Sequence, residues 1–252
     1  MKPTFLTYEK PLLTVILQCT NPDTAIGRIR KALDIGGEAF GLQVESLERE
    51  YQNAETIGRI FAEMQGKPIY VTNYRKKANT GKTDEELAQG LLNLADWGAT
   101  LCDVMGDMFC KHPEELTDDP EAIAKQMQLI DQLHSKGAEV LMSSHVLKFI
   151  PAERVLEIAL EQQRRGADVV KIVTGADTME QQIENLRITH LLKENLKVPF
   201  LFLSGGKCAI HRRIGPNLGC CMYLCVYEHD EYSTKNQPLL QKVKAIRDNM
   251  DA

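Results

Sequence analysis

One lysine lies inside an apolar segment of the sequence. Lys171 is part of the run 168–173, Asp-Val-Val-Lys-Ile-Val, which has the composition of a buried strand. Lysine is rarely buried unless it is paired or functional, and apolar surroundings disfavour its charged form. A neutral amine can attack a carbonyl carbon and form an imine, so Lys171 is a candidate Schiff-base nucleophile. The alternative is a structural lysine that pairs or reaches solvent.

A histidine ends a second segment of this kind. His145 follows the run 140–144, Val-Leu-Met-Ser-Ser. Imidazole titrates near neutral pH and an imine makes the adjacent C–H acidic, so His145 is a candidate proton carrier. A capping or packing histidine is the alternative. The other histidines occur in helical or loop patterns and are expected at the surface: His112, His134, His190, His211 and His229.

Three further polar residues could bind a substrate. Arg213 and Gln237 could hold a carboxylate, the arginine as a charged fork and the glutamine as a neutral donor. Arg75 could hold a hydroxyl group or a second anion. The pair Gly205-Gly206 is more typical of a tight turn than of a phosphate-binding nest.

Regular elements must position these residues, and four glycines mark where the elements alternate. Gly37, Gly98, Gly137 and Gly166 each end a helical pattern, as a left-handed C-cap would, and each precedes a short apolar run. The chain contains eight apolar runs that we interpret as strands: Leu12–Leu17, Phe40–Val44, Ile69–Thr72, Leu101–Met105, Val140–Ser143, Val169–Val173, Phe200–Leu203 and Cys221–Val226.

Parallel strands joined by crossover helices close most simply as a barrel when there are eight of them. We therefore predict an α/β fold, a (β/α)8 TIM barrel, as a single domain over residues 1–252. The alternative is an open, doubly wound sheet, which would favour a glycine-rich first turn that this chain lacks. In a barrel the active site lies at the C-terminal ends of the strands, which is where Lys171 and His145 fall.

Several helices and end segments can also be predicted. A helix opens at Thr83 with acidic residues behind it, and others span Asp118–Lys136 and Pro151–Arg165. A closing helix is expected over residues 236–250. Residues 1–10 are expected to form a small strand that covers the closed end of the barrel.

Composition and charge narrow the possible functions. The net charge of -5 gives no basic footprint for nucleic acid, and no apolar run is long enough to predict a membrane span or a signal peptide. Seven cysteines without a CxxC pair predict thiols in a reduced, cytoplasmic protein. No metal or organic cofactor is expected, because the acidic pairs Glu114-Glu115 and Asp118-Asp119 are typical of solvated helix starts.

At these residues the chain resembles type I 3-dehydroquinate dehydratases, barrel enzymes of the shikimate pathway and aromatic amino acid biosynthesis. The run 166–172, Gly-Ala-Asp-Val-Val-Lys-Ile, is similar to the segment that holds the family's Schiff-base lysine. The run 140–145 with Pro151 behind it is similar to the histidine strand. Leu203-Ser204, Gly206-Lys207 and Arg213 resemble the seventh-strand motif, and Ser233 and Gln237 resemble the ends of a S-A-P-G-Q loop.

The resemblance implies a role for each of these residues. Lys171 would form an imine with the ring ketone, and His145 would remove a proton beside it and then protonate the departing β-hydroxyl. Arg213, Gln237 and Ser233 would hold the substrate carboxylate. The site residues near the ring hydroxyls would include Arg75, Gln43 and Asn79. The resemblance also implies a small keto acid as the partner and a homodimer as a possible assembly.

The chain departs from the family pattern at four positions. Gly41 and Gln43 replace a glutamate and an arginine, Asn79 replaces a glutamate beside the histidine, and Val146 replaces an aspartate. Asn79 could still hydrogen-bond His145, but it carries no charge. The lost groups would each contribute roughly 1.5–3 kcal/mol to binding of a polyhydroxy substrate.

Three functions remain open from the sequence. The first is a Schiff-base hydro-lyase acting on 3-dehydroquinate or a related β-hydroxy keto acid. The second is a class I aldolase-type lyase that uses the same lysine on another keto acid. The third is a non-catalytic barrel that binds a metabolite or a protein.

Overall fold

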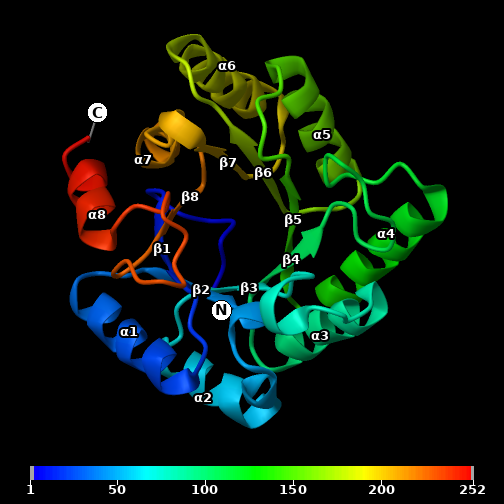
Figure 1. The fold of residues 1–252 in the computed structure, drawn as a ribbon, viewed down its shortest axis with the longest axis vertical. Helices are drawn as coiled ribbons and strands as arrows, with labels where there is room; N and C mark the ends of the chain where they lie inside the picture. Colours follow the sequence, from blue (N-terminus) through cyan, green and yellow to red (C-terminus); the bar gives the residue numbers. More distant parts are fainter. Residues whose placement is uncertain (1–2, 251–252) are drawn as a thin grey trace.

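Eight parallel strands form a nearly closed barrel in the computed structural model, which describes residues 3–250 (Figure 1). The strands are β1 Leu12–Leu17, β2 Ala39–Gln43, β3 Ile69–Thr72, β4 Leu101–Met105, β5 Glu139–His145, β6 Val169–Gly175, β7 Phe200–Gly205 and β8 Met222–Cys225. Their order is β7-β6-β5-β4-β3-β2-β1-β8. The predicted (β/α)8 barrel is confirmed.

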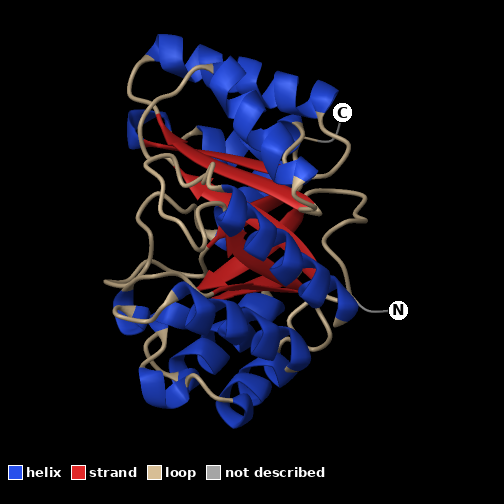
Figure 2. Cartoon of the chain, turned by 90° about the vertical axis from the view of Figure 1, so that its right-hand side faces the viewer, coloured by secondary structure: helices blue, strands red, loops and turns tan. Residues whose placement is uncertain are grey.

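Helices alternate with the strands and surround the barrel (Figure 1), and a view from the side shows the sheet between layers of helices (Figure 2). The helices are α1 Pro22–Asp34, α2 Ala54–Glu63, α3 Asp84–Asp96, α4 Pro120–Ser135, α5 Ala152–Arg164, α6 Met179–Asn195, α7 His211–Ile214 and α8 Leu240–Asp248. No helix in residues 3–250 is long and apolar enough to cross a membrane.

Local sequence fixes the helix ends. Thr83 and Glu86 form a reciprocal capping box at the start of α3, and Asp119 caps α4. Gly98 and Gly166 have φ angles of 116° and 101°, so they turn the chain from a helix into the next strand. After α1 the positive φ belongs to Gly36 and not to the expected Gly37.

The strand register sets which side chains share a layer inside the barrel. Ser143 on β5 lies opposite Lys171 on β6, and His145 lies opposite Val173. The strands at the two ends of this order, β7 and β8, are linked just before β8 begins. There the Cys221 amide donates to the Phe200 carbonyl of β7 at 2.9 Å. Closure of the ring therefore brings strands that are distant in sequence around one interior.

The segment before β1 covers the N-terminal end of the barrel, although not as a strand. Residues 3–10 have no regular structure, so the predicted strand is wrong there, and residues 1–2 lie outside the described residues. Phe5 is fully buried, and its amide donates to the Glu139 carboxylate at 2.9 Å. Glu139 begins β5, so this contact holds the segment against the closed end of the barrel.

We expect Phe5→Ala to lower the free energy of unfolding by about 3 kcal/mol, because it removes a fully buried ring and leaves a cavity. Chemical denaturation would measure the change. Phe149→Ala is the matched control, since that ring is 36% exposed and its loss should have a much smaller effect. Equal effects of the two substitutions would show that Phe5 does not anchor the end of the barrel.

Candidate active site

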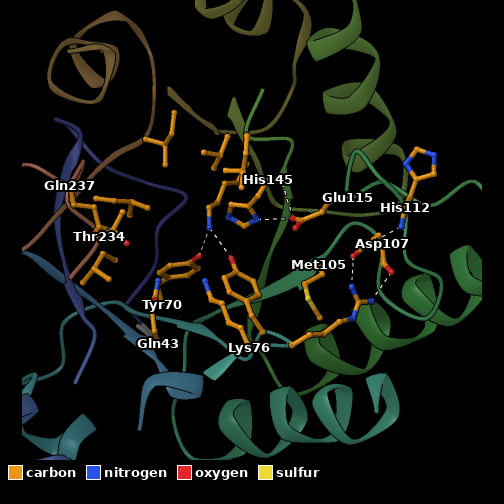
Figure 3. A pocket seen from close by; sticks show the side chains of 18 of the residues that line it. Gln43, Tyr70, Lys76, Met105, Asp107, His112, Glu115, His145, Thr234 and Gln237 are labelled. Atoms are coloured by element: carbon orange, nitrogen blue, oxygen red, sulfur yellow. Dashed lines mark hydrogen bonds and ion pairs between the residues drawn. The ribbon is translucent and has the colours of Figure 1, made fainter. Parts of the chain in front are cut away.

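A cavity of about 650 Å³ opens at the C-terminal ends of the strands (Figure 3). Every strand contributes one side chain or more to its lining: Ile16, Gln43, Tyr70, Met105, His145, Lys171, Leu203 and Leu224 among them. The loop after β8 adds Thr234 and Gln237. This position agrees with the expectation for a barrel enzyme.

Lys171 lies at the floor of the cavity and is 4% exposed. Its Nζ atom is 2.9 Å from the Tyr70 hydroxyl, 2.9 Å from the Tyr74 hydroxyl and 3.1 Å from Asp103 Oδ2. The amine is therefore held by polar oxygens and not only by the apolar neighbours that the sequence suggested. Sequence reasoning missed these three partners, which come from β3, the loop after it and β4.

Asp103 is a fully buried carboxylate inside the barrel. Burial alone would raise its pKa, but the Lys171 ammonium and hydrogen bonds from Ser143, Tyr70 and Tyr74 hold the pKa below its usual range. Burial and the Asp103 charge also raise the pKa of both tyrosines well above 10. The floor of the site thus combines one carboxylate, one amine and two neutral phenols.

His145 is held by a carboxylate from the loop between β4 and α4. Glu115 accepts hydrogen bonds from the backbone amide and from Nδ1 of His145, each at 2.8 Å (Figure 3). A carboxylate only accepts, so Nδ1 carries the hydrogen and Nε2 keeps a free lone pair. Burial and the nearby Lys171 charge lower the pKa of His145 below its usual value, although Glu115 opposes the shift.

Glu115 corrects two expectations from the sequence. It is not a solvated helix-start charge, because it is half-buried and bonded to His145. The expected Asn79–His145 hydrogen bond is also absent: Asn79 is fully buried and donates to the Asn73 side chain and the Tyr74 carbonyl. No spacing in the sequence indicated that a residue 30 positions before the histidine would reach it.

The loop that carries Glu115 is fixed from outside the barrel. Arg165, on the capping turn of α5, is 2% exposed and donates to the carbonyls of Gly106 and Thr117 and to the Gln126 side chain. Gln126 of α4 in turn donates to the Gly106 carbonyl at 2.9 Å. Both ends of the loop are therefore tied to helices α4 and α5.

Of the neighbouring arginines 212 and 213, the one that lines the cavity is Arg212 and not the expected Arg213. Arg212 is 8% exposed and lines the cavity, and burial lowers its pKa to about 10. The single hydrogen bond shown for its side chain runs from Nε to the Ser204 carbonyl, so its guanidinium fork faces the cavity without an acidic partner among the described residues. Arg213 does not line the cavity, and its side chain reaches only toward the Ala209 carbonyl at 3.5 Å.

Neutral polar side chains from β2 and from the loop after β8 also line the cavity. Gln43 lines the cavity and accepts a hydrogen bond from Gln18, which also donates to the Thr234 hydroxyl. Gln237 is 5% exposed, and its Oε1 atom has no partner among the described residues. Ser233 does not line the cavity, because its hydroxyl caps a turn at Asp230.

Three other predicted positions differ from expectation. Arg75 reaches the cavity, but Asp84 and Asp107 already hold its guanidinium at 2.6–2.7 Å. His211 was expected at the surface but is fully buried. Burial lowers its pKa to about 4. His112 is partly buried and belongs to the lining of the cavity, so it is not simply a surface residue.

Comparison with known proteins agrees with this geometry. The sequence model of the type I 3-dehydroquinase family matches residues 13–247. The chain belongs to this family. A 3-dehydroquinate dehydratase from Alkaliphilus oremlandii is 36% identical over 81 residues, 31% of this chain and 32% of that protein. The Klebsiella pneumoniae enzyme of the same name is 26% identical over 208 residues, 79% of this chain and 78% of that protein.

Solved structures of the family share the fold. A type I 3-dehydroquinate dehydratase from Clostridium difficile, described with covalently modified comenic acid, superposes with a TM-score of 0.80. The two chains are 16% identical, and the match covers 97% of this chain and 94% of the other. The expected carbon–oxygen lyase family is therefore confirmed, and the low identity agrees with a divergent member.

We expect Glu115→Gln to lower kcat/KM by about 10²-fold, because an amide can donate to Nδ1 and leave Nε2 without its lone pair. Loss of the carboxylate also removes a group that raises the His145 pKa, so the acidic limb of the pH–rate profile should move to lower pH. Glu114→Gln is the matched control, since Glu114 pairs with Arg154 outside the cavity. An unshifted profile in Glu115→Gln would contradict this role.

Proposed function

We propose that this protein dehydrates 3-dehydroquinate, or a closely related β-hydroxy keto acid, through an imine on Lys171. One observation carries the proposal: a buried amine at the floor of the cavity, beside a carboxylate and a histidine with its Nε2 atom free. The family membership supports the same reaction. A keto group that enters the cavity meets the amine at the ends of the strands.

Imine formation places a positive charge where Asp103 can stabilise it. The neutral Lys171 amine attacks the ketone carbon, and loss of water gives a protonated imine. The Asp103 carboxylate, 3.1 Å from Nζ, then faces this cation in surroundings of low polarity, where a charge interaction is strong. The imine in turn withdraws electrons and makes the neighbouring C–H acidic.

His145 carries out the elimination in this scheme. Its Nε2 atom takes the proton from the carbon beside the imine, and the same proton then goes to the β-hydroxyl as the C–O bond breaks. Glu115 stabilises the imidazolium that exists between the two steps. Water then hydrolyses the imine, which releases the unsaturated product and restores the Lys171 amine.

We assign carboxylate binding to Arg212 and Gln237. The buried guanidinium of Arg212 gains an anionic partner when the substrate binds, and a charge-assisted hydrogen bond is the strongest kind available there. Gln43 is the group we propose near the ring hydroxyls. The geometry does not support the other predicted substrate contacts. Three of these residues do not line the cavity: Asn79, Arg213 and Ser233. The fourth, Arg75, is already paired with Asp84 and Asp107.

Borohydride reduction in the presence of 3-dehydroquinate should fix the substrate onto Lys171, as a mass increase on the intact protein. The absorbance of the conjugated enone product should rise when borohydride is absent. Lys171→Met should lose both signals, because it removes the amine that Tyr70, Tyr74 and Asp103 hold at the cavity floor. Two other lysines, Lys76 and Lys111, also line the cavity. Turnover that survives in Lys171→Met would exclude the imine mechanism, and an adduct without enone would point to another lyase reaction.

We expect Arg212→Met to lower kcat/KM by about 10- to 100-fold, because one charged hydrogen bond contributes about 1.5–3 kcal/mol. Arg213→Met is the matched control, as it removes the same charge one residue away and outside the cavity. Steady-state kinetics of enone formation would compare them. If Arg213→Met lowered kcat/KM more than Arg212→Met, the substrate carboxylate would instead be assigned to Arg213.

A further inference from the structure

Three oxygen atoms surround the Nζ atom of Lys171. The hydroxyls of Tyr70 and Tyr74 lie 2.9 Å from it, and Asp103 Oδ2 lies 3.1 Å from it. Each phenol also donates to the same Asp103 oxygen at 2.5 Å. The ammonium group and the two phenols therefore form one continuous hydrogen-bond network in which every proton has an acceptor.

The position of Tyr70 depends on an adjacent glycine. A methyl group at Gly41 would lie 2.9 Å from the Tyr70 ring and 2.4 Å from Ile16, so the ring takes up space that a side chain at position 41 would need. Tyr70 and Tyr74 are 2% and 6% exposed, and both line the cavity. Their hydroxyls therefore lie at the amine, where the substrate carbonyl must arrive. A phenyl ring without a hydroxyl could pack in the same space, so packing alone does not explain why both residues are tyrosines.

We propose that Tyr70 and Tyr74 are catalytic residues for imine formation, which carry protons between Lys171, Asp103 and the substrate oxygen that leaves as water. This inference rests on the proposed function, because it requires a keto substrate at Lys171. It adds to that function a second set of proton-transfer groups, separate from His145.

The network supplies each proton that imine formation needs. One ammonium proton first moves to Asp103, which leaves a neutral Lys171 amine and a neutral carboxyl group. The amine lone pair then forms the C–N bond while the C=O π bond breaks. A nitrogen proton passes through a phenol to the new alkoxide, because the phenol gives its own proton to oxygen and accepts one from nitrogen.

Loss of water completes the cycle without any added reagent. The Asp103 proton passes through a phenol to the carbinolamine hydroxyl, the C–O bond breaks, and water leaves with both electrons of that bond. The nitrogen lone pair forms the C=N bond. Of the three protons that began on nitrogen, one remains on the imine and two leave in water, so Asp103 and both phenols return to their starting states.

The geometry separates this task from that of His145. Nζ has hydrogen bonds to the two phenols and Asp103, and none to His145 is found in residues 3–250. Tyr74 lies between the two groups, since its ring also meets the His145 ring edge-on at a centroid distance of 5.4 Å. Burial and the Asp103 charge keep the phenol pKa values high, so the phenols remain protonated and pass protons on.

The test compares Tyr70→Phe, Tyr74→Phe and the double variant with the wild-type protein. Each variant is mixed with saturating 3-dehydroquinate and quenched with borohydride after increasing times, and intact mass gives the rate at which the Lys171 adduct appears. We expect the double variant to form the adduct about 10²-fold more slowly, in the range that general acid–base groups contribute. His145→Gln is the comparison, in which the adduct should form at nearly the wild-type rate without enone.

A pH profile distinguishes proton transfer from a merely structural role. In the wild-type protein the rate of adduct formation should change little from about pH 6 to about pH 8, because the protons circulate within the network. In the double variant it should fall as the pH rises, since acid from solvent must replace the phenols. Thermal unfolding would verify that each variant is folded, and the two single variants remain informative if the double variant is not.

Each outcome separates this inference from the proposed function. An adduct that forms at the wild-type rate in the double variant, or a slow rate with the unchanged wild-type pH profile, would overturn the role of the tyrosines and leave the imine mechanism intact. Failure of the wild-type protein itself to form an adduct would overturn the proposed function, and this inference with it.

Discussion

The buried ion pair between Asp103 on β4 and Lys171 on β6 is the interaction on which the rest of the site depends. Neither side chain is more than 5% exposed. Removal of two charges from water costs several kcal/mol for each, and their attraction offsets that cost only where further hydrogen bonds complete the geometry. Ser143, Tyr70 and Tyr74 provide those bonds to Asp103. A single polar layer inside an apolar barrel thus joins β3 to β6.

This layer divides the barrel into two functional halves. Toward the N-terminal end, the interior is packed with apolar side chains and is covered by Phe5. Toward the C-terminal end it opens into the cavity, where Arg212 offers a charge and Gln43 offers a neutral amide. Lys171 therefore lies on a rigid floor, and the polar groups above it come from the end of β2 and from the segment after β7.

The histidine is oriented by a loop that helices hold in place. Glu115 reaches His145 because Arg165 and Gln126 fix the backbone of the β4–α4 connection. A buried, fully hydrogen-bonded arginine is a stable way to fix a loop, since its donors need acceptors wherever water is excluded. The orientation of His145 is thus set by contacts outside the barrel interior.

The sequence by itself determined the barrel and the strand on which Lys171 lies, and tertiary structure decided which polar groups meet. Eight apolar runs separated by helical patterns allow few other folds, and a lysine within such a run is expected to be buried. Successive residues on a helix point about 100° apart, so no local pattern could show that Arg212 and not Arg213 faces the cavity. The contacts of Glu115 with His145, and of Tyr70 with Lys171, join residues 30 and 101 positions apart. Barrel closure and loop conformation bring such residues together, and both arise from the packing of the whole chain.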